Sequence, residues 1–356
     1  MFTLHLYIYN YSFGFICMSK ITIKTLAQQL GLSIATVSKA LKDSHEISAD
    51  TKKKVVMLAA QLNYVPNPYA SSLRKQKSKT IAVILPEVAD NFFSLAINGI
   101  QAVAAQKNYH VLIYLSHESF SIEKDVVNHC SSGRVDGVLI SISSETTDAE
   151  HIQKLQKENI PCVFFDREFE KLEAPKVITN DYESGYLSAK LLLEKGCKYP
   201  VFLSNSLSLS ICSKRAAGFI AALTDAGFSK NDYQFVIDCT GTSEFIFEQV
   251  KTLLLQHKGI DGIVASVERL AMQIYMVSIA NGIRISEDLK VVAFSTLETA
   301  PILHPSLTTI TQPAFEIGKA AAELLFTMIE KKRPITAPNT TIVLPSTLIE
   351  RNSTSV

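Results

Sequence analysis

The chain has 356 residues, of which 47% are hydrophobic and 19% charged, a composition typical of a soluble globular protein with more than one domain. The formal net charge is only +1, but residues 18–79 hold eleven lysines and arginines against three acidic residues, and the rest of the chain is acidic. A basic N-terminal part on an acidic body indicates a polyanion partner for that part alone. No apolar run approaches the roughly 18 residues of a membrane span.

The six cysteines form no CxxC pair and no Cys/His ligand spacing. They predict neither a metal site nor a disulfide framework, and are typical of thiols in a reducing cytoplasm. The first 17 residues, MFTLHLYIYNYSFGFIC, are aromatic and uncharged, and lack the basic segment and cleavage site of a signal peptide. We interpret residues 1–17 as a non-native or disordered extension and expect Met18 to be the biological first residue.

Two short helices are predicted within residues 21–42, ITIKTLAQQLGLSIATVSKALK. Thr22 and Ser33 are suitable N-cap residues, and apolar residues follow each at helical spacing. Gly31 lies between the two patterns, where a tight turn favours a residue without a Cβ. This arrangement is typical of a helix-turn-helix, whose second helix enters the DNA major groove.

A third helix is predicted over residues 49–62, with an apolar stripe that can close over the first two. Asn67 and Pro68 then form an N-cap and first-position pair, which predicts a brief helix to about Arg74. A helix of this length is stable only when something supports it. A polar, basic linker follows.

The run from Ile21 to Arg74 resembles the LacI/GalR family of bacterial repressors almost without gaps. The motifs are TIKxxAxxxGLSxxTVSKxL, ISxxTKxxV and NYxPNxxAxSLR. The resemblance implies that Leu73 is the leucine that each of two hinge helices inserts into a minor-groove step. The residues that it implies for DNA contact are Thr22, Ser33, Ile34, Ala35, Thr36, Ser38, Lys39, Asn67, Ala70, Leu73 and Arg74.

Ile34 and Ala35 depart from the polar pair often found at these positions of the family. They cannot make bidentate hydrogen bonds, so any base reading there would use thymine methyl groups. Lys39 would then carry most of the hydrogen-bonding readout.

From Thr80 onward, short apolar runs alternate with amphipathic segments, and the pattern restarts near residue 177. The predicted strands are 81–85, 111–115, 135–140, 163–165, 177–178, 200–203, 234–237, 262–265, 290–294, 308–310 and 341–344. The predicted helices are 93–107, 122–130, 148–158, 181–194, 214–226, 244–257, 269–280 and 313–330. Continuous apolar strands between such helices indicate parallel sheets covered on both faces.

The predicted fold class is therefore α/β: a small all-α helix-turn-helix head and a two-lobed body of two parallel-sheet subdomains. The resemblance implies a type I periplasmic-binding-protein-like body whose chain crosses between lobes three times. We expect crossings near Asn180, at 295–312 and at 332–340. The expected boundaries are 18–66 for the head, 67–79 for the hinge helix and linker, and 80–352 for the body. Lobe 1 would take about 80–179 and 311–335, and lobe 2 about 180–310 and 340–352.

Ligands of such folds bind at the carboxyl ends of the strands, between the lobes. The resemblance and the strand ends together give Asn91, Phe92, Phe93, Ser141, Asp166, Arg167, Arg215, Glu268 and Ser295 as candidate effector contacts. Two alternatives stay open: Phe93 is equally a core residue at a helix start, and Arg215 is alternatively a surface arginine that caps nearby carbonyls.

Two positions depart from the family. Glu268 stands where many relatives have Asp, and Ser295 stands where an Asp often accepts bonds from hydroxyl groups. A cleft that keeps Arg167 and Arg215 but lacks this Asp favours a less hydroxyl-rich or an anionic ligand, since guanidinium pairs well with carboxylate or phosphate.

The function that the sequence predicts is that of a dimeric transcriptional repressor on a pseudo-palindromic operator, with a small-molecule effector, a sugar or sugar derivative, between its lobes. The alternatives are a solute-binding protein, which predicts a signal sequence, and a regulator controlled by a protein partner. The sequence contains no P-loop, GxGxxG, GxSxG or HExxH motif, so we expect no enzyme activity, cofactor or metal.

Overall fold

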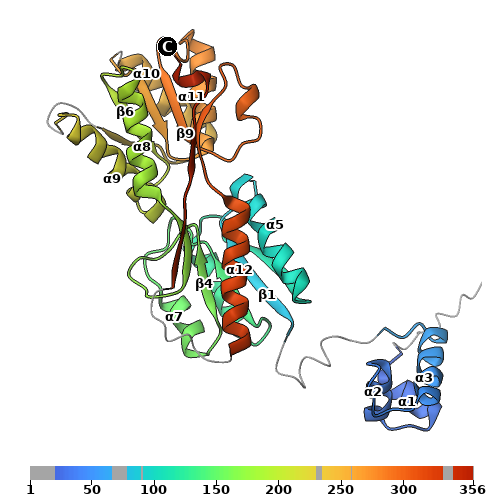
Figure 1. Ribbon diagram of the computed structural model, residues 1–356. Helices are drawn as coiled ribbons and strands as arrows, with labels where there is room; N and C mark the ends of the chain where they lie inside the picture. Colours follow the sequence, from blue (N-terminus) through green and yellow to red (C-terminus); the bar gives the residue numbers. More distant parts are fainter. Residues whose placement is uncertain are drawn as a thin grey trace, which may run out of the picture. The chain divides into compact units, whose positions relative to one another are not determined.

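The structure, a computed structural model, describes residues 21–65, 78–89, 91–229, 235–257, 259–331 and 340–355 (Figure 1). The chain divides into two compact units, one up to Lys75 and one from Gln76 onward. Each is described by itself, as the head and the body. The predicted extension 1–17 and the hinge residues Asn67, Ala70, Leu73 and Arg74 lie outside the described residues.

The head has three helices within its described part: α1 (Ile23–Leu30), α2 (Ile34–Leu41) and α3 (Ala49–Gln61). Thr22 caps α1 in a reciprocal pair with Thr25. Gly31 follows α1 with φ of 63°, a conformation that costs glycine nothing. Leu26, Val37 and Val55, one from each helix, are fully buried against one another in a small core. The predicted helix-turn-helix and its third helix are present.

Lobe 1 of the body is a parallel six-stranded sheet with strand order β11-β5-β4-β3-β1-β2. Its strands are β1 (Thr80–Leu85), β2 (His110–Leu115), β3 (Gly137–Ile140), β4 (Cys162–Phe165), β5 (Lys176–Thr179) and β11 (Thr341–Leu344). Its helices are α5 (Asn91–Gln106), α6 (Phe120–Cys130), α7 (Glu150–Lys157) and α12 (Ala314–Lys331).

Lobe 2 has a second six-stranded sheet, with order β12-β10-β9-β8-β6-β7. Its strands are β6 (Pro200–Ser204), β7 (Val236–Asp238), β8 (Gly262–Ala265), β9 (Lys290–Phe294), β10 (Thr308–Thr311) and β12 (Thr347–Ile349). Only β12 is antiparallel to its neighbour. Its helices are α8 (Asp181–Glu194), α9 (Ser210–Asp225), α10 (Ser243–Gln256), α11 (Glu268–Asn281) and the 3₁₀ turns η1 (Ala300–Ile302) and η2 (Asn352–Thr354).

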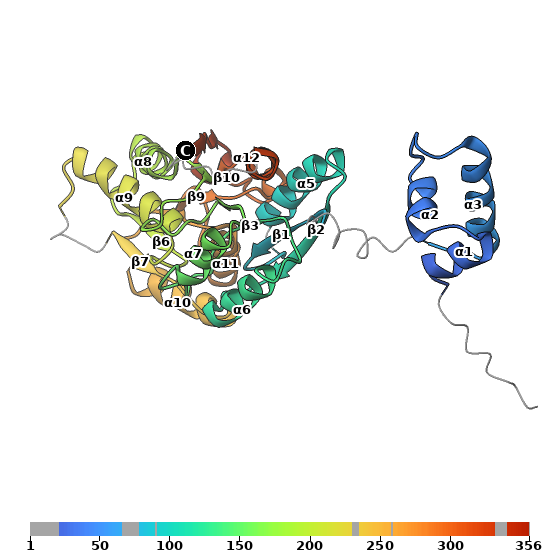
Figure 2. The same cartoon turned by 90° about the horizontal axis from the view of Figure 1, so that it is seen from below.

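Helices cover both faces of each sheet, as Figure 2 shows for the body seen from below. Successive residues of β1 divide between two cores: Ile81 and Val83 pack with α5 and α12, whereas Ala82 and Ile84 pack with α6 and α7. This alternation follows from the two-residue period of a strand. The predicted α/β class with parallel, doubly covered sheets is confirmed.

One boundary prediction is wrong. Residues 341–344 were expected in lobe 2, but β11 pairs in parallel with β5 and therefore belongs to lobe 1. The third crossing consequently lies between β11 and β12, at residues 345–346, and not at 332–340. The first crossing follows β5 at Asn180, and the second follows β10 at Gln312. The three-residue strand β12 was not predicted, because a run of three residues is too short to show a period and its burial alternates.

Each lobe contains one pair of helices whose backbones touch at glycines. In lobe 1, a Cβ on Gly99 of α5 would lie 2.1 Å from a backbone oxygen of α12, and a Cβ on Gly318 of α12 would lie 2.0 Å from a backbone oxygen of α5. In lobe 2, Gly185 of α8 and Gly218 of α9 face each other in the same way, with distances of 2.0 Å and 1.9 Å. Only glycine permits such close backbones.

Candidate functional site

The exposed surface of α2 begins with apolar side chains. Ser33 caps the helix, since its Oγ accepts a hydrogen bond from the Thr36 backbone N–H at 3.0 Å and lies 2.9 Å from Thr36 Oγ1. Ile34 and Ala35 follow on the first turn and are exposed. The N-terminal turn of α2 therefore offers methyl groups, and its two hydroxyls are engaged in the cap.

Lys39 is the only charged residue of α2. Its side chain is half exposed, and its ammonium forms an ion pair with Glu46, from the loop after the helix. Ser38 beside it is partly buried, and Val37 and Ala40 face the core. The polar chemistry of the helix is thus concentrated in one Lys–Glu pair near its C-terminus.

The body contains a small cavity between its two lobes. Lobe 1 contributes Phe92 and Phe93 from the start of α5 and Asp166 and Arg167 from the loop after β4. The other lining residues are Ile211, Arg215, Val267, Glu268, Phe294, Ser295, Thr296 and Gln312. The cavity volume is about 30 Å³, which is room for roughly one or two water molecules. A sugar-sized molecule enters only if the lobes separate.

Arg215 is the lobe 2 cation of the cavity, and only 2% of its side chain is exposed. Its Nε donates to Asp181 Oδ1 at 2.7 Å, and its Nη1 donates to the Ser266 carbonyl at 2.7 Å. The guanidinium stacks 4.2 Å from the centre of the Phe294 ring. Its Nη2 is buried with no hydrogen-bond partner among the described residues. Burial raises the pKa of the Asp181 carboxyl, and the positive charge of Arg215 opposes that rise.

Arg167 is the corresponding cation of lobe 1. Its Nη1 donates to both carboxylate oxygens of Glu118, at 2.9 and 3.1 Å, and its guanidinium lies 5.7 Å from the Phe93 ring centre. Burial alone would raise the pKa of the Glu118 carboxyl, but Arg167 and the Ser144 N–H bring it below its ordinary value. The Arg167 Nε has no hydrogen-bond partner among the described residues and lies 3.9 Å from Asp166 Oδ2.

Glu268 joins the lobes across the cavity. Its Oε1 accepts a hydrogen bond from the Asn91 backbone N–H of lobe 1 at 3.3 Å, and its Oε2 accepts from Ser295 Oγ and the Thr296 N–H of lobe 2. Asn91 also donates from Nδ2 to the Thr296 carbonyl at 2.5 Å. These contacts fix the distance between the two walls.

A second polar contact between the lobes surrounds Glu168, which is 4% exposed. Its carboxylate forms ion pairs with Lys176 of lobe 1 and with Lys214 of α9, the latter at 2.7 Å. Burial would raise the pKa of the Glu168 carboxyl, but the two lysines lower it below its ordinary value of 4.5. Ser208 Oγ also donates to the Ser144 carbonyl across the lobes at 2.9 Å.

The structure brings seven of the nine candidate effector contacts together in the lining. Asn91 lies beside the cavity through its bonds to lobe 2, and Ser141 is fully buried outside the lining. Both readings of Phe93 hold, since its ring is core and wall at once. Five lining residues were missed: Ile211, Val267, Phe294, Thr296 and Gln312. Thr296 and Gln312 follow β9 and β10, and their place at strand ends was a usable signal.

The charges around the cavity do not favour an anion. Arg167 and Arg215 each have a carboxylate partner, and two further carboxylates line the cavity. The four acidic groups are Glu118, Asp166, Asp181 and Glu268. The expectation of a less hydroxyl-rich or an anionic ligand considered only Glu268 as a neutralising partner, and the sequence could not show that Glu118 and Asp181 pair with the two arginines.

Two absences apply to the described residues alone. No group of three or more His, Cys, Asp or Glu side chains among them could hold a metal ion. Within the same ranges, no helix is long and apolar enough to cross a membrane.

A helix-turn-helix head and a two-lobed α/β body with a polar cavity between its lobes define a class of DNA-binding transcription regulators with a ligand domain. Residues 22–67 match the family described as bacterial regulatory proteins, lacI family. Residues 78–347 match the periplasmic binding proteins and sugar binding domain of the LacI family. The chain belongs to the LacI family and is a DNA-binding transcriptional regulator.

Characterised relatives match along nearly the whole chain. The HTH-type transcriptional regulator RegA of Clostridium saccharobutylicum is 29% identical over 94% of this chain and 99% of its own length. The ribose operon repressor of Bacillus subtilis is 28% identical over 94% of this chain and 98% of its own. In fold, a lac repressor dimer bound to operator and an anti-inducer matches with a TM-score of 0.82 at 22% identity, covering 95% of this chain and 100% of that one.

Proposed function

We propose that the protein represses transcription as a homodimer in the cytoplasm and that a small molecule bound between the lobes controls it. The observation that carries this proposal is the interlobe cavity, where two arginines and two carboxylates from opposite lobes meet. Since the cavity holds only about 30 Å³, binding a sugar-sized ligand must change the separation of the lobes. A ligand that favours one separation shifts the population of that state. In this proposal the protein is not an enzyme and uses no cofactor.

The proposed effector is a neutral, hydroxyl-rich molecule. Hydroxyl groups both donate and accept, and the cavity offers both partners: carboxylate oxygens of Asp166 and Glu268, and guanidinium N–H groups of Arg167 and Arg215. Phe92 and Phe93 supply apolar ring surface against a sugar face. The ribose operon repressor among the relatives points to the same chemistry.

On the DNA side, we assign base reading to α2. Ile34 and Ala35 would contact thymine methyl groups, and Lys39 would donate to guanine O6 or N7. Thr22, Ser33, Thr36 and Ser38 would contact phosphates through their hydroxyl groups, and the N-terminal N–H groups of α1 and α2 would add to these contacts. The hinge residues Asn67, Ala70, Leu73 and Arg74 would act in the minor groove, Leu73 as the inserted wedge.

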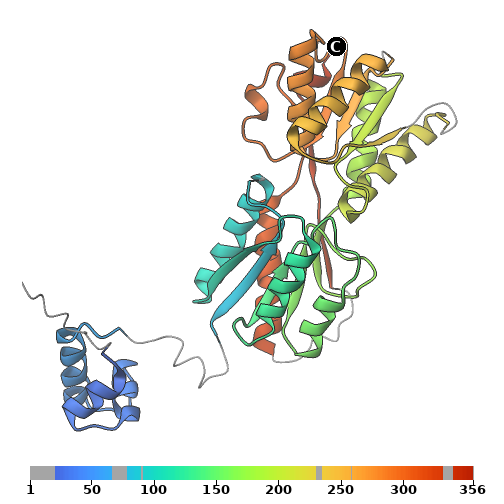
Figure 3. The ribbon, with the colours of Figure 1, turned by 180° about the vertical axis from the view of Figure 1, so that it is seen from behind.

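The proposed dimer uses one edge of the body. Exposed apolar side chains are present on β2 of lobe 1 and on α11 and η1 of lobe 2: Leu112, Ile113, Met276, Ile279 and Ile302. Figures 1 and 3 show α5 of lobe 1 and the orange segment around η1 of lobe 2 along the same edge. A second copy would cover this surface, and its two-fold symmetry would match a pseudo-palindromic operator.

The test uses the full chain and a duplex that it selects from a random-sequence library. We expect binding to weaken steeply with salt, by about 10³-fold or more between 50 and 200 mM if six to ten phosphates are contacted. The selected duplex should be pseudo-palindromic. No binding at low salt would refute the proposal.

A panel of neutral sugars and their phosphates is then titrated against the protein–DNA complex. We expect a neutral sugar to change DNA affinity more than its phosphate does. Arg215→Lys keeps a charge beside Asp181 but removes the fork of N–H donors, so it should lose the sugar response and retain DNA binding. A phosphate that acts more strongly than its parent sugar would restore the anionic alternative.

A further inference from the structure

The loop after α2 is built to return toward that helix. Asp43 has φ of 53°, its N–H donates to the Ala40 carbonyl at 3.1 Å, and the Ser44 N–H donates to the Lys39 carbonyl at 3.1 Å. These two bonds form a Schellman motif, in which a residue of left-handed conformation reverses the chain at a helix end. Ile47 then re-enters the core. Glu46 is therefore held at a defined place beside the last turn of α2.

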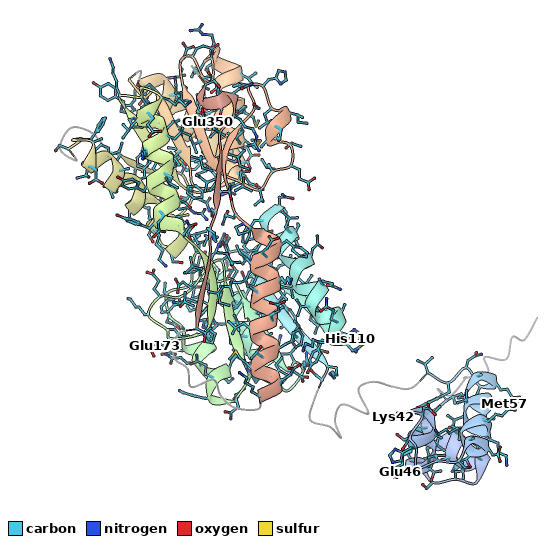
Figure 4. All side chains as sticks on the ribbon, viewed as in Figure 1. Lys42, Glu46, Met57, His110, Glu173 and Glu350 are labelled. Atoms are coloured by element: carbon cyan, nitrogen blue, oxygen red, sulfur yellow. The ribbon has the colours of Figure 1, made fainter. Side chains whose placement is uncertain are left out.

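This turn brings Glu46 to Lys39, and the two side chains form an ion pair. The two side chains are about equally exposed, 52% for Glu46 and 50% for Lys39. Figure 4 shows Glu46 and Lys42 at the surface of the head on the side of α2, whereas Met57 of α3 lies on the other side. Ile34 and Ala35 carry no hydrogen-bonding side chain, so Lys39 is the residue of α2 proposed to donate hydrogen bonds to bases. Its charge is paired with that of Glu46.

We propose that Glu46 is a specificity-determining residue that suppresses binding of the head to DNA of the wrong sequence. The proposal rests on the proposed DNA-binding function of α2. An ammonium group has three N–H donors, so Lys39 can keep its contact with Glu46 while it donates to a guanine acceptor in the groove. If Lys39 instead contacts a phosphate, the contact does not depend on the base sequence, and it brings the negative phosphate close to the negative Glu46 carboxylate. Glu46 thus weakens the sequence-independent part of binding more than the specific part.

The same loop supplies a matched control. Asp43 forms an ion pair with Lys52 of α3 at 2.6 Å, and its side chain is 88% exposed. Asp43→Asn removes one negative charge three residues from Glu46, and asparagine also accepts the left-handed conformation that the turn requires. It leaves the Lys39–Glu46 pair in place. Any effect of Glu46→Gln that Asp43→Asn reproduces is a general charge effect.

The experiment compares four full-length variants with the unaltered chain: Glu46→Gln, Asp43→Asn, Lys39→Gln and the double variant Lys39→Gln/Glu46→Gln. Each is titrated with the duplex selected from the random library and with a random-sequence duplex of equal length. We expect Glu46→Gln to strengthen binding to the random duplex roughly fivefold, with a salt slope steeper by about one. Binding to the selected duplex should change less than twofold, so the specificity ratio falls.

The double variant isolates the Lys39 contact. In the Lys39→Gln background, Glu46→Gln should leave the specificity ratio unchanged, because the ammonium that it restrains is gone. Circular dichroism spectra and thermal unfolding establish that each variant is folded. An unchanged ratio in Glu46→Gln, or the same fall in Asp43→Asn, overturns the proposal. Selective loss of binding to the selected duplex also overturns it, since Glu46 would then itself accept a bond from a base. If the unaltered chain binds neither duplex, the proposed function fails instead.

Discussion

The two lobes solve the same packing problem with different segments. Lobe 1 pairs α5 with α12, which lie at opposite ends of the body sequence, and lobe 2 pairs α8 with α9, which are consecutive. Both pairs meet at one glycine from each helix. The backbone contact is therefore a property of this sheet-and-helix layer and does not depend on how the chain connects it.

The lobes differ in how that contact relates to the cavity. In lobe 2, the atom closest to a Cβ on Gly185 would be the carbonyl oxygen of Arg215 itself. The cavity arginine is thus fixed by helix packing and by its Asp181 partner on α8. In lobe 1, Arg167 follows β4 and is held by Glu118, whose side chain is 33% exposed. Both arginines are buried, but the carboxylate partner is buried in lobe 2 and one-third exposed in lobe 1.

The largest expected effect tests this difference in burial. Asp181→Asn removes the carboxylate from a pair whose side chains are both no more than 3% exposed. It leaves the Arg215 charge buried without compensation, and we expect the free energy of unfolding to fall by about 4 kcal/mol. Urea unfolding followed by circular dichroism measures it.

The matched change in lobe 1 is Glu118→Gln. Because Glu118 is one-third exposed and Arg167 keeps Asp166 at 3.9 Å, we expect a loss of about 1 kcal/mol or less. Equal losses of unfolding free energy for the two variants would show that the two carboxylate–arginine pairs contribute equally to stability. The proposed difference between the lobes would then be wrong.

Much of the fold could be predicted because a strand that is buried on both faces has an uninterrupted apolar sequence. β3, β4 and β8 are buried at every position, and their apolar runs were visible as strands. β11 was also visible as a strand, but its partner was not. Pairing with β5 is a contact between segments more than 160 residues apart, and nothing within a four-residue strand of mixed exposure specifies that partner.

For the cavity, too, local features could be predicted and contacts between distant segments could not. The positions of Asp166 and Arg167 could be predicted because motif and strand end coincide there. Arg215, which lies within α9, could be predicted from its motif alone. Their charge partners could not, because Glu118 and Asp181 lie 49 and 34 residues from the arginines that they neutralise. The prediction of a less hydroxyl-rich or an anionic ligand was drawn from the two arginines and from Ser295 without these partners. The ligand chemistry of a cleft is set by such partners as much as by its lining residues.

A middle-sized effect separates packing from ligand geometry. Gly218→Ala places a Cβ 1.9 Å from the Tyr182 carbonyl oxygen, and Gly318→Ala places one 2.0 Å from the Ala96 carbonyl oxygen. Both helix pairs must move apart, and we expect each variant to lose about 2 kcal/mol of unfolding free energy. Only Gly218→Ala shifts α9 and with it Arg215.

The readout is DNA release by the most effective sugar of the panel, measured on both variants. We expect Gly218→Ala to lose this response and Gly318→Ala to weaken it less at temperatures where both are folded, because α9 carries Arg215 whereas α5 supplies only the rings of Phe92 and Phe93. Loss of response in both would mean that α12 also sets the cavity geometry, and the helix pairs would then be equivalent in function as well as in packing.

Another small expected effect concerns the contact between the lobes. Asn91→Ala removes the Nδ2 donor that bonds to the Thr296 carbonyl, and it leaves the backbone bond to Glu268. We expect a loss of about 1 kcal/mol in unfolding free energy. Asn281→Ala is the matched control, since its Nδ2 donates at 2.8 Å to the Val277 carbonyl within lobe 2 alone.

Hydrogen–deuterium exchange then distinguishes the two variants. With the interlobe bond gone, the separated arrangement of the lobes becomes more populated, so amides near Thr296 and at the start of α5 should exchange several-fold faster in Asn91→Ala. Strands β3 and β8, deep in the two sheets, should be unchanged. Asn281→Ala should speed exchange only at the end of α11. If exchange at the cavity segments is unchanged in both variants, the Glu168 ion pairs hold the lobes together. The hydrogen bond from Asn91 would then form when the lobes close but would not stabilise the closed arrangement.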